Sequence, residues 1–524
     1  MKNIDPKTIT VKRALCPFCS FGCEFGIVFN DFGIKGVEYV KDGNNNGRLC
    51  PRGSAAAIYL DHPRRSTIPL KSGKAVVWSK MAKELGKVVG SPKSAAVTFD
   101  RNVTPEEYAA ILGFCDSVGI QYTASTYFEP EHILRPFLEQ PFAPADLDKA
   151  NIVFVLGDLF NQAPMSSRAI IEWKMKDKRN ELVVIDSLNT HTAGFASQFL
   201  KVNIGTEPLL LLGLAQENIG GMDIATATGI DGGIVKRLSN AIKNSGKGLI
   251  YASLPFGHTY DPALCAEGLN RMHEFSDMKV VPFVEFAGYD GNQSFPAIIE
   301  MVKKKKIKNL INFGELFPFY YPQLVDKLKG ANIYATSTLK HKDQTLLPVP
   351  LNIEKEGTVV TTFGKRKLTG NIDPPSGVKS IEAILSMLSS ESSKGKVPNS
   401  VEKKIDVKER ARRITEITGT KKKSFKLVGE KVAYNFLGFL EGEALKINPF
   451  DAAELGIGAH DTASITSKQS SADLPVKITE DVGQGVVAVA AETPSVRGLF
   501  EYEIDNELQT VNFIPTEVKI CRKE

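Results

Sequence analysis

The sequence predicts an α/β protein with a small cysteine-rich domain at the N-terminus, parallel-sheet domains in the middle and a β-rich domain at the C-terminus. Three observations lead to this prediction. Four of the seven cysteines lie within the first 50 residues. Between residues 71 and 390, short apolar runs alternate with amphipathic stretches, which is typical of βαβ units. Residues 425–524 read as short strands between Gly and Pro turns.

Residues 1–70 make up the expected first domain. They are rich in Gly, Cys and polar turn formers, and residues 25–29 and 34–39 are predicted strands. The first residues contain neither an apolar stretch nor a twin arginine, so we expect no export signal. The other cysteines are isolated, which does not fit an extracellular disulfide framework. We therefore expect metal ligation in a reducing compartment, the cytoplasm.

Residues 71–390 are the expected α/β domains. Apolar runs at 94–99, 151–158, 181–186, 247–254, 280–286 and 308–315 predict strands that are buried on both faces. Helical patterns cover 104–118 and 166–178. Cys115 falls inside the first of these patterns, so we expect a buried core thiol there.

The remaining segments are a predicted linker and a final domain. Residues 391–424 are charged and serine-rich and show no core pattern, so they predict a linker with a short helix. Residues 425–524 form the β-rich domain, with strands expected at 487–491 and 509–515.

Composition excludes two classes of partner. The net charge of +5 arises from 65 basic and 60 acidic residues, which is too balanced to indicate nucleic-acid binding. No stretch of 18 apolar residues occurs, so we expect no membrane span.

The four N-terminal cysteines carry the most specific signal. Cys16 and Cys19 are separated by two residues, Cys19 and Cys23 by three, and Cys50 follows 26 residues later. A [4Fe–4S] cluster takes four thiolates, three from one tight loop and a fourth from elsewhere in this arrangement. The alternative is a four-cysteine zinc site, which usually has two paired Cys-x-x-Cys knuckles. Only one cysteine is present in the second half here, so the cluster is the favoured prediction.

The cysteine spacing, followed by LCPRG and LDHPRRSTIPL, resembles the N-terminal cluster domain of the molybdopterin oxidoreductases, a group that includes formate dehydrogenases and the large cluster subunit of NADH dehydrogenase. The resemblance continues through VFVLGDLFNQAPMSSRAIIEWK, LVVIDSLNTHTA, LKVNIGTEPLLLLGL and EKEGTVVTTFGKRKL, and ends in a segment similar to the C-terminal dinucleotide-binding barrel. It implies Rossmann-like middle domains, a double-psi type barrel and a bis-molybdopterin guanine dinucleotide carrying Mo or W.

The resemblance also implies roles for individual residues. Arg52 stands where the family often has a lysine between cluster and pterin. Asp186 is placed to accept hydrogen bonds from a guanine or ribose. The other residues expected to bind the cofactor are Gly157, Asp158, Gly205, Thr206, Glu207, Gly357, Thr358 and Asp461. The alternative for Arg52 is a surface charge beside the cluster, the alternative for Asp186 is a cap at a strand end, and for the others it is plain turn chemistry.

The sequence departs from the family where a protein ligand to Mo or W is expected. The matching stretch, GIQYTASTYFEPEHILRP, has no cysteine. Ser125 and Tyr127 are the candidates there, and His191 is a further candidate catalytic group. Ser187 also follows Asp186 where family members often have proline.

These observations leave two main functional hypotheses. The chain is a molybdopterin-type oxidoreductase subunit that passes electrons between a pterin-bound metal and partner subunits through one cluster. Alternatively, it is a non-catalytic electron relay or scaffold that has lost the Mo or W centre. A module that only binds partners is a third hypothesis, which the complete cysteine set disfavours. The first two require partner subunits that carry further iron–sulfur clusters or flavin.

Overall fold

The structure is a computed structural model of the chain, and it describes residues 9–245, 247–284, 289–389, 395, 404–419, 424–434 and 444–523. By internal packing, the chain divides into two compact units. Unit 1 comprises residues 1–127, 286–361 and 365–402, and unit 2 comprises residues 128–285, 362–364 and 403–524. Most of the predicted linker before residue 404 lies outside the described residues.

Unit 1 begins with a three-stranded antiparallel sheet. Its strands are β1 (Thr10–Leu15), β2 (Glu24–Asn30) and β3 (Gly33–Glu38), paired in that order. Two short helices follow, α1 (Pro51–Ser54) and α2 (Ala56–Leu60). Phe25 and Ile27 alternate inward along β2 and are fully buried, as the period-two pattern of a strand requires.

The main sheet of unit 1 has seven strands in the order β5-β4-β15-β14-β13-β6-β7. The four strands β14, β13, β6 and β7 run parallel to one another, and β15 is parallel to β14. Helix α4 begins at a capping box formed by Thr104 and Glu107 and ends at Gly119, which has a left-handed backbone. The strands are β4 (Leu70–Lys71), β5 (Lys74–Ala75), β6 (Ala95–Phe99), β7 (Tyr122–Ser125), β13 (Asn309–Phe313), β14 (Asn332–Ser337) and β15 (Leu346–Pro348).

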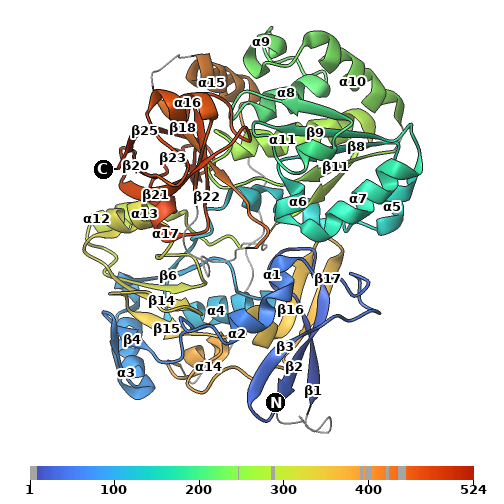
Figure 1. The fold of residues 1–524 in the computed structure, drawn as a ribbon. Helices are drawn as coiled ribbons and strands as arrows, with labels where there is room; N and C mark the ends of the chain where they lie inside the picture. Colours follow the sequence, from blue (N-terminus) through green and yellow to red (C-terminus); the bar gives the residue numbers. More distant parts are fainter. Residues whose placement is uncertain are drawn as a thin grey trace. The chain divides into compact units, whose positions relative to one another are not determined.

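Helices and one hairpin complete unit 1 (Figure 1). The core lies between the sheet and the apolar sides of its helices, and Cys115 on α4 is a buried member of it, as expected. The helices are α3 (Trp78–Val89), α4 (Pro105–Val118), α12 (Phe295–Lys303), α13 (Pro322–Val325) and α14 (Ile381–Ser386), and the hairpin is β16 (Glu356–Thr361) with β17 (Gly364–Thr369).

Unit 2 contains a five-stranded parallel sheet in the order β10-β9-β8-β11-β12. Strands β8 and β11 are buried along their whole length, which explains their uninterrupted apolar sequence. The strands are β8 (Ile152–Leu156), β9 (Glu181–Asp186), β10 (Gln198–Lys201), β11 (Gly248–Ala252) and β12 (Lys279–Pro282). The helices are α5 (Pro144–Lys149), α6 (Leu159–Gln162), α7 (Pro164–Lys176), α8 (Glu207–Leu214), α9 (Ile224–Thr228), α10 (Gly232–Ser245) and α11 (Pro262–Ser276).

The C-terminal part of unit 2 is a closed six-stranded barrel, in agreement with the predicted β-rich domain. Strand β18 is parallel to β22 and β19 is parallel to β21, while the other neighbours are antiparallel. The barrel strands are β18 (Phe425–Glu430), β19 (Leu445–Ile447), β20 (Thr462–Thr466), β21 (Ser471–Ile478), β22 (Val486–Ala490) and β25 (Thr516–Arg522). Beside it lie α16 (Pro449–Glu454), α17 (Pro494–Arg497) and the hairpin β23 (Tyr502–Asp505) with β24 (Thr510–Phe513).

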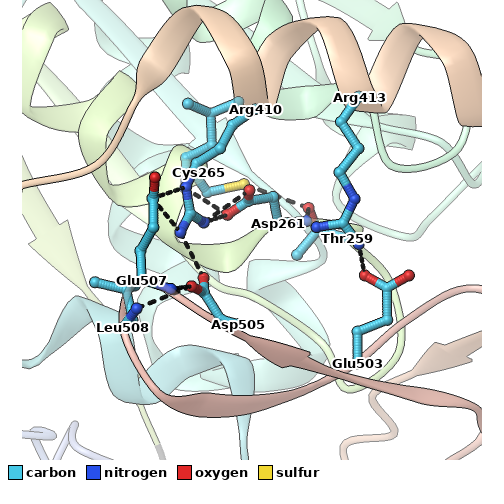
Figure 2. Close-up of polar contacts among 10 residues, drawn as sticks. Thr259, Asp261, Cys265, Arg410, Arg413, Glu503, Asp505, Glu507 and Leu508 are labelled. Carbon is cyan, nitrogen blue, oxygen red and sulfur yellow. Dashed lines mark hydrogen bonds and ion pairs between the residues drawn. The ribbon is translucent and has the colours of Figure 1, made fainter.

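Helix α15 (Val407–Gly419) corrects one sequence-based expectation, because it does contribute to a core. Ala411 and Ile414 are buried against the apolar side chains of α8 and α11. Arg410 on the same helix binds Asp261, at the start of α11, through Nη1 at 3.0 and 2.9 Å (Figure 2). Val407 and Ile417 pack against the same cluster, so α15 carries apolar residues at helical spacing between its many charged ones.

Among the residues that the structure describes, none of the helices is both long enough and apolar enough to cross a membrane.

Candidate functional site

The first three cysteines lie in the loop that joins β1 to β2. Cys16 directly follows β1 and its N–H donates to the carbonyl of Cys23 at 2.7 Å, so the loop is closed at its base. Gly22 turns the loop with a left-handed φ of 62°, a conformation that favours glycine. Cys16 and Cys23 are buried and Cys19 is half-buried. The hairpin therefore carries three thiols in the loop between two paired strands, and their role as cluster ligands stays a prediction.

Cys50 is brought to the same part of the chain by the segment before α1. It is the N-cap residue of α1, and its Sγ accepts a hydrogen bond from Gly53 N at 3.5 Å. Asn44, a few residues earlier, donates through Nδ2 to the carbonyls of Phe21 and Gly22 at 3.2 and 3.0 Å. The segment that carries the fourth thiol is thus fastened to the loop that carries the other three.

The neighbouring thiols affect the pKa values of Cys16 and Cys23. Burial raises the pKa of Cys16 well above its usual value, and the charges of Cys50 and Cys19 raise it further. Burial likewise raises the pKa of Cys23, with Cys16, Cys19 and Cys50 adding to the effect. Arg52, which is fully buried, acts in the opposite direction on both pKa values. Four sulfur donors, a sulfur-directed N–H and a buried cation suit a [4Fe–4S] cluster, whose iron would stabilise the thiolates.

The candidate catalytic side chains are distributed over both units. In unit 1, Ser125 ends β7, and its Oγ accepts from Tyr127 N at 3.3 Å, while the Tyr127 ring is buried. In unit 2, His191 is exposed and lies edge-on to the rings of Phe160 and Phe195. Within the described residues, no three His, Cys, Asp or Glu side chains are arranged to hold a single metal ion. The catalytic roles of these three residues stay predictions.

The turn after β8 is closed by internal contacts. Gly157 has a φ of 82°, and a Cβ added to it would stand 2.4 Å from the carbonyl oxygen of Ser253, which follows β11. Asp158 accepts from Thr192 Oγ1 and from Asn161 Nδ2, both at 2.6 Å. Both oxygens of this carboxylate are therefore used by side chains of the same unit.

Asp186 and Glu207 meet around a residue that the sequence did not single out, His258. Asp186 ends β9, Glu207 begins α8, and His258 lies in the loop between β11 and α11. His258 Nε2 is 3.3 Å from Asp186 Oδ1 and 3.6 Å from Glu207 Oε1. Its other ring nitrogen faces the carbonyl oxygen of Gly429 at 3.4 Å, and all three side chains are buried.

The charge state of this buried cluster follows from its geometry. Burial lowers the pKa of His258, but the hydrogen bond and charge of Asp186 and the charge of Glu207 outweigh it and raise the pKa to about 9. Burial raises the pKa of Glu207 to about 7, against the lowering effect of His258. His258 Nε2 also lies 3.1 Å from the Ser187 hydroxyl, and the two neighbouring carboxylates favour the protonated ring.

The two carboxylates were expected to bind the dinucleotide, and their surroundings test that expectation. Asp186 Oδ1 also accepts from Leu188 N at 2.9 Å. Asp186 Oδ2 and both oxygens of Glu207 have no hydrogen-bond partner among the described residues, yet they have almost no accessible surface. The acceptor chemistry suits the N–H donors of a base, but the enclosed oxygens leave no room for one. In this structure the carboxylates do not fit a bound dinucleotide.

Gly205 and Thr206 complete the turn before Glu207. Gly205 has a φ of 74°, and a Cβ added there would lie 2.3 Å from the ring of Tyr260. Thr206 Oγ1 donates to the Asn203 carbonyl at 2.7 Å, so its hydroxyl closes the turn. The β11–α11 loop, which carries both His258 and Tyr260, therefore packs directly on this turn.

A second residue missed from the sequence, Asp100, lies in unit 1 after β6. Its carboxylate accepts from the backbone N–H groups of Glu315, Leu316 and Phe317 at 2.6, 3.1 and 2.9 Å, and from Asn312 Nδ2 at 3.1 Å. Burial raises the pKa of Asp100 to about 7, and these four donors act against that shift. Asp100 directly follows the predicted strand at 94–99, and His258 comes four residues after the predicted strand at 247–254, so a position just after a buried strand was the available signal.

The remaining predicted cofactor residues are Gly357 and Thr358, which lie in β16, and Asp461, which directly precedes β20. In unit 1, Thr358 N donates to Glu106 Oε2 at 3.0 Å, next to Gly357 with its φ of 134°. In the barrel, Asp461 accepts from Gly458 N at 2.8 Å and pairs with Arg522 at 2.9 Å. Of the three residues, only Asp461 lies in a turn, whereas Gly357 and Thr358 belong to a strand, and the binding roles of all three stay predictions.

Two family models match the ends of the chain. The model described as the molybdopterin oxidoreductase Fe4S4 domain matches residues 9–62, and the model described as the molydopterin dinucleotide binding domain matches residues 416–515. The first range contains all four cysteines, and the second covers most of the barrel. These matches confirm the predicted resemblance, support a [4Fe–4S] cluster and allow a bis-molybdopterin guanine dinucleotide with Mo or W.

Curated relatives match a smaller share of the chain. The F420-dependent formate dehydrogenase subunit alpha of Methanocaldococcus jannaschii is 24% identical over 223 residues, 38% of this chain and 32% of that protein. The NADPH-Fe(3+) oxidoreductase subunit alpha of Geobacter sulfurreducens is 26% identical over 231 residues, 40% of this chain and 27% of that protein. The chain thus matches about a third of the length of these relatives.

One solved structure shares the fold over nearly the whole chain. Acetylene hydratase from Pelobacter acetylenicus superposes with a TM-score of 0.70 at 12% identity, covering 98% of this chain and all of that one. The predicted fold class is therefore confirmed: an N-terminal cluster domain, parallel-sheet α/β regions and a C-terminal barrel.

Proposed function

Because the chain carries the Fe4S4 domain and the dinucleotide-binding domain of the molybdopterin oxidoreductases, we propose that it is an electron-carrying iron–sulfur subunit of a redox complex. The observation that carries this proposal is the loop that holds Cys16, Cys19 and Cys23 between two paired strands, with the segment that carries Cys50 hydrogen-bonded to that loop through Asn44. A bound [4Fe–4S] cluster supplies one-electron transfer.

The residues around the thiols have separate tasks in this proposal. The four cysteines hold the cluster, and Gly53 N points toward the sulfur of Cys50, where a hydrogen bond would favour the reduced cluster. Arg52 places a fully buried positive charge beside the thiols, which offsets part of their negative charge. The rings of Phe18, in the cysteine loop, and Tyr59, on α2, are both buried and pack edge to face with their centres 4.8 Å apart.

Two forms of this function remain as proposals. The first is an oxidoreductase subunit that exchanges electrons between a pterin-bound Mo or W and its partners, and the match of the barrel to a dinucleotide-binding domain supports it. The second is a relay or scaffold subunit without Mo or W. The absence of a cysteine near the expected ligand position and the enclosed Asp186 and Glu207 support the second form.

Partners and compartment belong to the same proposal. The relatives from M. jannaschii and G. sulfurreducens are named as alpha subunits, and one cluster rarely makes a complete electron path. We therefore infer partner subunits with further iron–sulfur clusters or flavin. Buried free thiols suit a reducing compartment, so we place the complex in the cytoplasm.

A cysteine substitution tests the proposal. Cys50→Ser should abolish the electron paramagnetic resonance signal of the reduced cluster and lower iron from about four atoms per chain, the content of one cubane. Cys521→Ser is the matched control, since Cys521 is exposed on β25 and far from the cysteine loop in sequence. A Cys50→Ser protein with full iron and an unchanged signal would refute the ligand set.

Metal analysis of the same anaerobic preparation separates the two forms. Stoichiometric Mo or W would establish the first form and exclude the second. Iron at the stoichiometry of one cluster, with neither Mo nor W, would establish the second form and exclude the first.

A further inference from the structure

Each parallel sheet of this chain has one place where a ligand would be expected. In open α/β sheets, ligands bind at the carboxyl ends of the two adjacent strands from which the chain departs in opposite directions. In unit 1 these strands are β6 and β13, because β7 lies on one side of the pair and β14 on the other. In unit 2 they are β8 and β11, flanked by β9 and β12.

In unit 1, this crevice holds a carboxylate of the chain itself. Residues 315–317 follow β13 and direct three consecutive N–H groups at Asp100, which follows β6. Consecutive N–H groups of this kind form an anion-binding concavity, which suits a phosphate. Four donors face the Asp100 oxygens, so the concavity holds an anion already. A Cβ added to Gly314 would stand 1.9 Å from Asp100 Oδ1, so the carboxylate is in close contact with the loop.

In unit 2, the crevice is filled by the β11–α11 loop. Ser253, the first residue after β11, touches the backbone of Gly157 after β8. Farther along, His258 takes the position between Asp186 and Glu207 where the N–H donors of a base would be needed. The remaining carboxylate oxygens have almost no accessible surface.

The loop that carries His258 is fixed on both sides. A Cβ on Gly429 of β18 would stand 1.9 Å from the Phe256 carbonyl oxygen, so the barrel strand lies directly on the loop. The Phe256 ring packs against Phe500 and Phe513 at 5.2 and 4.7 Å, and the Arg497 guanidinium lies 4.3 Å from its centre. His258 is therefore held in place by a packed aromatic group, and not by the two acids alone.

We infer that both crevices are closed by charged side chains of the chain itself, Asp100 in the place of a phosphate and His258 in the place of a base, so that neither sheet receives the nucleotide half of a dinucleotide. The two closures are independent, since they lie in different units and use opposite charges. The inference concerns the sheets and not the cysteines, so it can fail while the proposed cluster function stands.

The direct test is nucleotide content. The chain is purified with its partners without oxygen and hydrolysed in acid, and released GMP, AMP and CMP are quantified against protein and iron. We expect about four iron atoms per chain, as one cubane requires, and only traces of nucleotide. Stoichiometric nucleotide beside full iron overturns the inference alone. Missing iron without nucleotide overturns the proposed function alone.

A gain of binding gives a second, independent test in unit 1. Asp100→Ser frees the three N–H groups, so this variant should bind inorganic phosphate in calorimetry at concentrations where the unaltered chain binds none. Asp116→Ser, the same substitution at an exposed position on α4, is the control and should bind none. Phosphate binding by the unaltered chain, or a folded Asp100→Ser protein that binds no phosphate, would overturn the assignment of Asp100. Circular dichroism establishes that the variant is folded, and the nucleotide measurement decides the matter if it is not.

Discussion

Arg410 offers a quantitative test of how α15 is held in unit 2. Its guanidinium donates to both oxygens of Asp261, to Asp505 at 2.7 Å and to Glu507 at 3.0 and 2.8 Å (Figure 2). Asp261 and Asp505 have side chains only 8% and 6% exposed, whereas Glu507 is 46% exposed. The arginine is therefore the counter-charge of two buried acids and contributes little through the third.

Arg410→Met keeps most of the aliphatic stem but removes the charge. Removing one partner of a buried ion pair leaves an uncompensated charge and costs about 3–5 kcal/mol. Arg413→Met is the matched control three residues along the same helix, because Arg413 pairs with Glu503 at the surface, with side chains 50% and 36% exposed. Exposed pairs contribute about 0–1 kcal/mol.

Urea unfolding followed by circular dichroism measures both variants. We expect the free energy of unfolding to fall by about 3–5 kcal/mol for Arg410→Met and by less than about 1 kcal/mol for Arg413→Met. Burial raises the pKa of Asp261, and the charge of Arg410 acts against that increase. The pKa of Asp261 should therefore be still higher in the Arg410→Met variant. A folded chain that binds this proton more tightly gains stability as the pH falls, so the loss should shrink below neutral pH. Equal losses for the two variants at pH 7.5 would refute the reasoning.

Two further predictions concern His341 and Gly429. His341 stacks on Phe319 with ring centres 3.8 Å apart, and burial with the charge of Arg64 lowers its pKa to about 3. The unfolded chain then binds a proton that the folded chain does not, so the free energy of unfolding should fall by about 1–2 kcal/mol between pH 7 and pH 5. His341→Phe should remove this part of the pH dependence in thermal unfolding scans. An unchanged pH dependence in the variant would contradict the prediction. Gly429→Ala should cost about 1–3 kcal/mol by overpacking, since its Cβ would meet the Phe256 carbonyl, whereas Gly483→Ala, with open space around it, should change the unfolding midpoint little.

The local elements were readable because their causes are local. The apolar runs at 151–158 and 181–186 correspond to β8 and β9. The helical pattern at 104–118 corresponds to α4, which begins one residue later than predicted. Burial on both faces requires continuous apolar residues, and a capping residue such as Thr104 marks a helix start whatever surrounds it. The cysteine spacing belongs to the same class, because a turn between two strands sets which thiols can share a cluster.

Side-chain partners far apart in sequence could not be predicted. The sequence around Asp186 does not indicate that His258 lies beside it. The sequence around Asp100 likewise does not indicate its contact with the N–H groups of residues 315–317. Arg410 and Asp261 are separated by 149 positions, and their pairing depends on how α15 lies against α11. Such contacts are fixed by the order of strands in a sheet and by helix packing, and neither is encoded in any short segment.

The sequence by itself predicted the cluster ligands, the alternation of strands and helices, and the β-rich C-terminal domain, because each prediction follows from spacing or periodicity within a few tens of residues, whereas the closed barrel was implied only by the resemblance. Only the tertiary structure decided what the carboxyl ends of the two sheets hold. There the balance of charge, burial and close packing sets which groups meet. In this chain, Asp100 and His258 lie at the carboxyl ends of the two sheets, where the topology alone predicts a bound ligand.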